Sequence, residues 1–99
     1  GVLIETDKNL NIVKSYELSF ADDYSGICVD NLNQELWILS DISATANKCN
    51  LQGELIESFG VPVSNPEGIA FYPQDSVLYI ISDSQSRLYK FDLKANNKK

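Results

Sequence analysis

The sequence lacks histidine and methionine altogether, and it has only eight basic residues against 14 acidic ones. Without histidine the chain has neither the commonest general base nor the usual zinc ligand, so we assign no catalytic residue and expect no triad within it. The net charge of −6 repels phosphates, which argues against a nucleic-acid partner. The residues left for chemistry are carboxylates and amides, the ligands of a hard cation such as calcium.

Long apolar runs and clustered cysteines are missing too. No stretch of about 18 apolar residues occurs, so we expect no direct membrane contact by this segment. The two cysteines, Cys28 and Cys49, do not have the spacing of a zinc site. They fall on the first and third strands of one expected sheet, about 10 Å apart, which is beyond disulfide reach. The sequence therefore predicts two free thiols.

The main feature that is present is an internal repeat. Residues 26–51 match residues 68–93 at a spacing of 42 without a gap, and eight of the 26 positions are identical. Both copies contain the motif Leu-aromatic-Ile-(Leu/Ile)-Ser-Asp. A shorter third copy, residues 7–13, resembles residues 50–56 with a register that differs by one residue. A period in the forties, filled with short apolar segments and turns, is typical of a β-propeller blade.

The pattern within each repeat predicts short strands and no helix. Polar turn residues interrupt any helical period, and β-branched and aromatic residues dominate the apolar segments. Residues 36–39 form an apolar run without alternation, which predicts burial on both faces. The expected strands are residues 2–6, 11–20, 25–30, 35–40, 45–51, 54–60, 67–72, 77–82 and 87–93.

These strands correspond to about two and a third four-stranded antiparallel blades. We expect a partial blade at residues 2–20, a blade at 24–60, an incomplete blade at 66–93 and a solvated basic tail at 94–99. Propellers close with about four to eight blades, because a blade buries its faces only against its neighbours. The chain is therefore expected to be part of a ring. Either it is a fragment of a longer protein, or it completes the ring by self-association.

Glu67 is the leading candidate site residue. It lies where the chain begins an innermost strand, which in a propeller faces the mouth of the central channel, and Gly68 after it permits close backbone approach. The equivalent position in the preceding repeat is Ser25. The alternative interpretation is that Glu67 and Ser25 cap turn amides or pair with a lysine.

Other repeated polar residues are expected to have structural roles. Asp41 and Asp83 each end the second strand of a repeat, where we expect their side chains to accept turn amide hydrogens. Because both copies have this residue, it is more typical of blade construction than of a site.

The aromatic residues are expected to form interfaces. Trp37 and Tyr79 occupy equivalent positions in the middle of a strand, which favours a core between blades over a stacking platform. Tyr89 and Phe91 share one face of their strand, and we expect that face to meet a missing blade.

Residues 65–71 (Asn-Pro-Glu-Gly-Ile-Ala-Phe), 77–83 and 87–92 resemble the SdiA-regulated, YjiK-like bacterial family, as do residues 23–27 and 36–41. The resemblance covers nearly the whole chain. It implies a six-bladed propeller in an exported or membrane-anchored bacterial protein, periplasmic or in the cell envelope, of unassigned activity. NHL repeats and lactonase-like propellers share the Pro-x-Gly-Ile strand beginning.

In lactonase-like and phytase-like propellers, which this chain resembles more distantly, a glutamate at this position binds calcium in the channel. Glu67 is the residue placed to match it. Ser25 departs from that pattern, so the other ligands would come from blades outside this chain.

Three functions follow as hypotheses. The first is a non-enzymatic propeller module that binds a ligand or a protein partner at the channel mouth or rim. The alternative is a calcium-dependent hydrolase of lactonase or phosphoesterase type, with Glu67 as the metal ligand. The third, NHL-like RNA binding, needs a basic face that the chain lacks.

Overall fold

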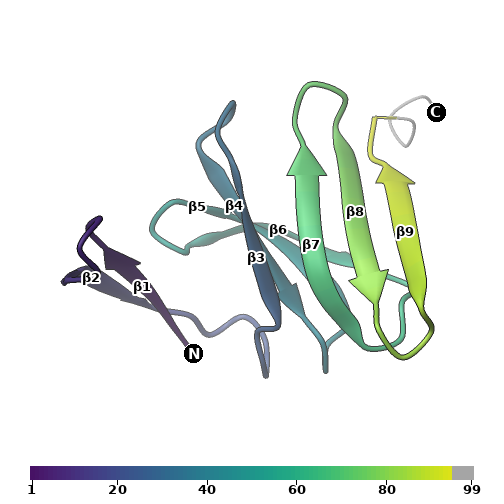
Figure 1. Cartoon of the computed structure of the whole chain (residues 1–99), viewed down its shortest axis with the longest axis horizontal. Helices are drawn as coiled ribbons and strands as arrows, with labels where there is room; N and C mark the ends of the chain where they lie inside the picture. Colours follow the sequence, from purple (N-terminus) through teal and green to yellow (C-terminus); the bar gives the residue numbers. More distant parts are fainter. Residues whose placement is uncertain (95–99) are drawn as a thin grey trace.

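The computed structural model describes residues 1–94, which fold entirely as antiparallel β-structure (Figure 1). The predicted all-β class is confirmed. Within these residues no helix is long and apolar enough to cross a membrane. Of the predicted tail, all but Lys94 lies outside the described residues. The strands are β1 (Val2–Thr6), β2 (Ile12–Glu17), β3 (Gly26–Asp30), β4 (Glu35–Ser40), β5 (Thr45–Asn50), β6 (Leu55–Gly60), β7 (Pro66–Tyr72), β8 (Val77–Ser82) and β9 (Arg87–Asp92).

The strands form three separate sheets, each in sequential order. These are a two-stranded hairpin β1-β2, a four-stranded sheet β3-β4-β5-β6 and a three-stranded sheet β7-β8-β9. Figure 1 shows the two larger sheets side by side, with the hairpin beyond the opposite side of the four-stranded sheet. This order requires only short connections, so each sheet is a meander built from neighbouring parts of the chain.

The hairpins β1-β2 and β5-β6 have the same local structure, which accounts for the resemblance of residues 7–13 to residues 50–56. Oδ1 of Asp7 accepts the amide hydrogens of the residues two and four positions later, at 2.8 and 3.0 Å. Oδ1 of Asn50 does the same, at 2.9 Å in both cases. Leu10 and Gly53, each three positions further on, have positive φ angles of 68° and 81°. A bulge precedes both turns.

The turns after β4 and β8 differ from the prediction. The amide of Ala44 donates to the backbone carbonyl oxygen of Asp41, and the amide of Ser86 donates to that of Asp83, at 3.1 Å in both turns. The carboxylate that does accept a turn amide, at 2.9 Å, belongs to Asp23. The predicted side-chain role of Asp41 and Asp83 is therefore wrong. In the turn after β4, the two amides that the backbone bond leaves over, those of Ile42 and Ser43, donate to Asp23 and to the Ser40 hydroxyl instead.

The main core lies between the two larger sheets. Trp37 is only 1% exposed, and its indole lies 5.6 Å from the ring of Phe59 and 5.1 Å from the ring of Phe71, measured between centroids. The two aromatic partners come from different sheets, so one side chain joins both. The other buried residues of this cluster are Leu39, Ala46, Val61, Val63, Leu78 and Ile80. The prediction for Trp37 is confirmed.

Two other aromatic predictions fare differently. Tyr89 and Phe91 pack against the main core, so the prediction that their face meets a missing blade is wrong. Their strand β9 turns that face back toward β3-β6. Tyr79 lies on the other face of the β7-β9 sheet, away from the main core, with Ala70 and Lys90 as its cross-strand neighbours. The described residues place no further sheet against that face.

A second, smaller core attaches the β1-β2 hairpin to the four-stranded sheet. Leu36 and Ile38 from β4 pack there with Leu18 and Cys49. Residues 36–39 are therefore buried on both sides of their strand, as the absence of alternation predicted.

Replacing Trp37 with alanine is expected to lower the free energy of unfolding by about 3 to 5 kcal/mol, because the change leaves a cavity between both sheets. Urea denaturation of the purified chain measures the loss. Ile42→Ala is the matched control, since Ile42 is 70% exposed in a turn and its truncation should change stability by less than about 1 kcal/mol. Similar losses in both variants would contradict the central role of Trp37.

Candidate functional site

The beginnings of β3 and β7, the first strands of the two larger sheets, lie against each other. The Ser25 hydroxyl donates to the carbonyl oxygen of Pro66 at 3.0 Å, which links the two sheets. A Cβ on Gly26 would meet the carbonyl oxygen of Glu67 at 3.5 Å and Cγ2 of Ile69 at 3.4 Å. Both distances are ordinary van der Waals contacts, so a Cβ would fit at this position and the two strands do not need glycine here to approach each other.

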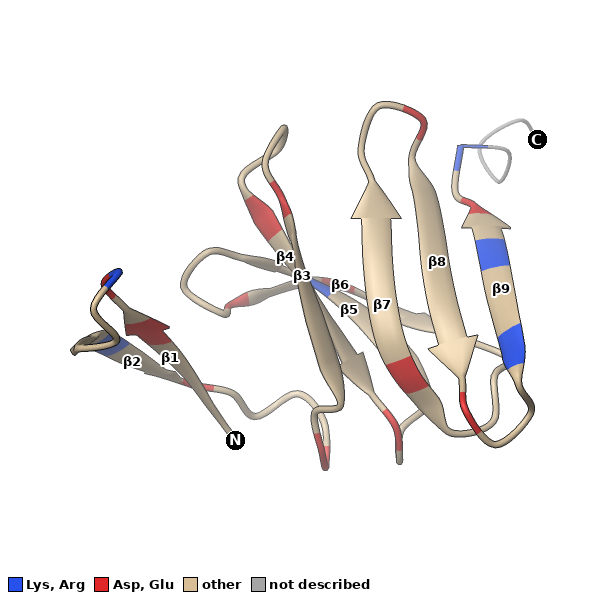
Figure 2. Cartoon of the chain, in the orientation of Figure 1, with Lys and Arg blue, Asp and Glu red and all other residues tan. Residues whose placement is uncertain are grey.

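Glu67 lies on the face of β7 that points away from the main core. It lines a shallow groove of about 520 Å³ with Asp83 and Arg87, and Figure 2 shows acidic and basic positions near this end of the β7-β9 sheet. Within residues 1–94 the Glu67 carboxylate makes no hydrogen bond and no ion pair. The alternative interpretation, in which Glu67 caps a turn or pairs with a lysine, has no support among these residues.

Ser25 does not share the groove with Glu67. Its hydroxyl points toward the junction of β3 and β7, where it donates to Pro66 and, at 3.5 Å, to the carbonyl oxygen of Leu39. The structure thus gives Ser25 a linking role, although the sequence aligns it with Glu67.

The groove does not by itself fit calcium. Calcium takes six to eight oxygen ligands. Only Glu67 and Asp83 bring carboxylates to the groove, and Arg87 places a competing positive charge there. No group of three acidic, cysteine or histidine side chains that could hold a metal occurs within residues 1–94. Glu67 as a metal ligand stays a prediction, and such a site would need ligands from outside these residues.

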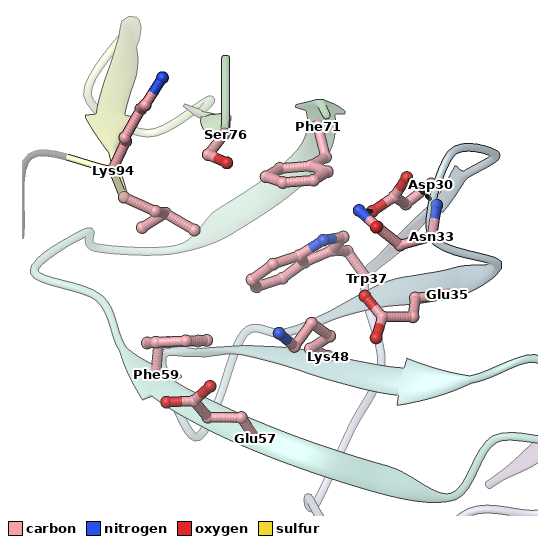
Figure 3. Close-up of a pocket in the computed structure, with 11 residues that line it drawn as sticks. Asp30, Asn33, Glu35, Trp37, Lys48, Glu57, Phe59, Phe71, Ser76 and Lys94 are labelled. Carbon is pink, nitrogen blue, oxygen red and sulfur yellow. Dashed lines mark hydrogen bonds between the residues drawn. The ribbon is translucent and has the colours of Figure 1, made fainter. Parts of the chain in front are cut away.

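The structure contains a second candidate site that the sequence reasoning missed. A cavity of about 340 Å³, here called the inter-sheet cavity, opens between the two larger sheets near the end of β3 (Figure 3). The signal in the sequence was Lys48, a charged residue in the middle of a largely buried strand. The lining residues are Asp30, Asn33, Glu35, Trp37, Lys48, Glu57, Phe59, Phe71, Ser76, Leu93 and Lys94.

One of the acidic groups in this cavity already has its partners. The Asp30 carboxylate is fully buried and accepts the amide hydrogens of Leu32 and Asn33 at 3.0 Å and the Asn33 side-chain amide at 2.8 Å. Three donors compensate the buried charge, so Asp30 holds the β3-β4 turn.

Both cysteines are free thiols, as predicted, and β4 separates their strands. Burial raises the pKa of the Cys28 thiol to about 11; the negative charge of Asp30 adds to this rise, and a backbone hydrogen bond at Phe71 opposes it. Burial alone raises the pKa of the Cys49 thiol to about 11. At neutral pH both are protonated and have no nucleophilic role.

No protein-family model matches this chain, and no curated protein matches it either. The resemblance to the YjiK-like family therefore rests on the residues quoted above. The arrangement offers two candidate sites, the Glu67 groove and the inter-sheet cavity, near opposite ends of β7.

We expect both thiols to react slowly with an aromatic disulfide reagent in the folded protein and both to react quickly after denaturation. The thiolate is the reactive form, and the raised pKa lowers its population. Because each pKa rises from 9.0 to about 11 on folding, the thiols contribute stability below pH 9 that is lost as the pH rises to about 11. Fewer than two thiols in the denatured, unreduced chain would contradict the assignment.

Proposed function

We propose that the chain forms consecutive blades of a β-propeller that binds a ligand or a protein partner at its channel mouth and supplies no catalytic residue. The observation that carries this proposal is the close approach of β3 and β7, the first strands of two sheets packed face to face. Blades of a propeller pack in this way, with their first strands around the axis. The family resemblance adds an exported or membrane-anchored bacterial protein as the setting.

The use of sheet faces also supports a propeller. Leu36 and Ile38 face the β1-β2 hairpin, whereas Trp37 faces the next sheet. Leu78, 42 residues after Leu36, faces back onto the four-stranded sheet, and Tyr79 faces away from it. Each repeat thus covers the preceding one with one face and offers its other face to a following one. Stacking in a constant direction is the packing of a repeat architecture.

The outward face of β7-β9 has the composition of a face that another sheet covers. Tyr72, Ile81 and Leu88 lie on it and are 51%, 49% and 66% exposed. Clustered exposed apolar side chains mark an interaction surface. We propose that a further sheet of the same kind covers this face, from a longer chain or from a second copy.

In the isolated chain this face should drive self-association. The mass in solution, measured by sedimentation, is expected to rise with protein concentration, and Ile81→Lys should suppress that rise by placing a charge in the interface. Ile42→Lys is the matched control, because Ile42 is 70% exposed in a turn away from the face. A single-chain mass at every concentration, or the same mass for both variants, would contradict the proposal.

Calcium-dependent hydrolysis is the second candidate function. The observation that favours it is the presence of Glu67 and Asp83 in one groove. Since the groove does not fit calcium alone, this function requires additional oxygen ligands from outside residues 1–94. The non-enzymatic module requires none.

Titration calorimetry of the assembled or full-length protein with calcium chloride separates the two candidates, because only that form supplies the further ligands. For a non-enzymatic module we expect no saturable binding, no calcium-dependent hydrolysis of a simple lactone or of p-nitrophenyl phosphate, and no effect of Glu67→Gln. Glu17→Gln, at the exposed end of β2, is the control for a lost negative charge. Saturable binding that Glu67→Gln abolishes and Glu17→Gln retains would overturn the proposal in favour of the hydrolase.

A further inference from the structure

An apolar groove lies between the β1-β2 hairpin and the four-stranded sheet. It has a volume of about 340 Å³ and is here called the β1 groove, because Val2, Leu3 and Ile4 of β1 form one wall. Ile27 of β3 and Ile38 of β4 lie on the opposite wall. Figure 1 shows β1 as the strand of the hairpin that lies nearer to β3. The groove adjoins the second core, so it extends an interface that the chain already uses.

One edge of β1 also opens here. Since the turns and bulges of the two hairpins match, β1 is equivalent to β5 and β2 to β6. The four-stranded sheet places β4 on the edge of β5 that faces away from β6. Among residues 1–94 no strand occupies that edge of β1, and an unpaired edge is a template for another strand.

The equivalent surface one repeat later shows what such a groove holds. Ile69 and Phe71 on β7 are only partly exposed, because β3 and β4 pack over them. Trp37 of β4 supplies the ring 5.1 Å from Phe71. Ile27 and Val29, 42 residues before Ile69 and Phe71, are 51% and 50% exposed. The hairpin brings no strands equivalent to β3 and β4, so this apolar surface stays open.

The existing pairs set the register of an added strand. Lys48 and Glu5 each precede the bulge of their hairpin, so they are equivalent positions. Trp37 is the cross-strand partner of Lys48, and Leu39 follows two positions along. Both side chains belong to the core against the next sheet. A strand added to β1 in the same way places an aromatic residue opposite Glu5 and points it, with an aliphatic residue, into the β1 groove.

We infer that β1 and its groove bind a β-hairpin whose second strand carries the motif Leu-aromatic-Ile-(Leu/Ile)-Ser. That strand pairs antiparallel with β1, and the first strand of the hairpin lies against β3. Main-chain hydrogen bonds provide part of the affinity, and the side chains in the groove provide the specificity. The inference rests on the repeat. It depends neither on the Glu67 groove nor on the sheet proposed to cover the outward face of β7-β9.

A synthetic hairpin of residues 66–83 is the probe, because it contains the motif and has no cysteine. Its dye-labelled form is titrated with the full chain, and fluorescence anisotropy should show saturable binding. The chain carries Ile81→Lys throughout, so that association through the face of β7-β9 does not contribute. Failure of the self-association proposed above would therefore leave this result unaffected.

Two peptide variants test which face of the added strand enters the groove. Tyr79 of the peptide takes the place of Trp37, so Tyr79→Lys in the peptide should weaken binding about tenfold or more by placing a charge among apolar side chains. Leu78→Lys is the matched control. Its side chain points to the other face of the strand, so this peptide should bind like the unaltered one. Equal losses in the two peptides would overturn the inference.

Two chain variants locate the site. Ile27→Lys places a charge in the β1 groove and should weaken binding about tenfold or more. Ile56→Lys is the matched control, because Ile56 is 52% exposed on β6, at the opposite edge of the four-stranded sheet. It should leave the affinity unchanged. The peptide pair keeps the test valid if Ile27→Lys fails to fold.

Hydrogen exchange tests the strand pairing itself. The amide hydrogens of β1 that point away from β2 should exchange with deuterium more slowly in the complex, because they become hydrogen-bonded. Side-chain contact alone would not slow them. Unchanged exchange in β1, no saturable binding of the peptide, or equal affinities for Ile27→Lys and Ile56→Lys would each overturn the inference.

Discussion

Burial of β4 on both of its faces is the constraint on which the rest of the structure depends. The neighbouring strands of its own sheet pair the backbone of β4, but they do not cover its apolar side chains. These side chains point to both faces of the sheet, so each face needs a further layer of structure packed against it. The hairpin β1-β2 covers one side and the sheet β7-β9 covers the other. This sandwich brings the beginnings of β3 and β7 together, which creates the Ser25–Pro66 hydrogen bond. It also leaves the inter-sheet cavity where the two sheets diverge.

The strands could be predicted from the sequence because their ends are chemically marked. Polar turn residues bound each apolar segment, and the 42-residue repeat lets each copy check the other. The strand predicted at residues 11–20 is the largest difference, since β2 ends at Glu17. Leu18 is apolar enough to extend the pattern, but its side chain is buried in the second core instead. Tertiary packing overrode the local preference there.

Other features depended on which face of a sheet meets which neighbour, and no local pattern contains that information. Tyr89 and Phe91 alternate correctly, but alternation alone cannot tell an inward face from an outward one. The same holds for the inter-sheet cavity. Trp37 has the pattern of a core residue, and only its surroundings reveal that its indole nitrogen lacks a partner. The Glu67 position was predictable, whereas the separation of Ser25 from its groove was not.

The hairpins β1-β2 and β5-β6 share their structure, so β1 can pair with a further strand on its open edge, as β5 pairs with β4. In β5, the edge away from β6 pairs with β4, and the corresponding edge of β1 has no partner within the described residues. The two strands of the type that fits this edge, β4 and β8, already have partners on both of their own edges, so a second molecule can offer one only by giving up a partner. One molecule therefore carries both halves of a pairing that its own topology does not complete. At high concentration, two copies of the chain can therefore exchange strands, with the open edge of β1 in one copy pairing with a strand of the other. The sequence already sets the order and the register of that pairing.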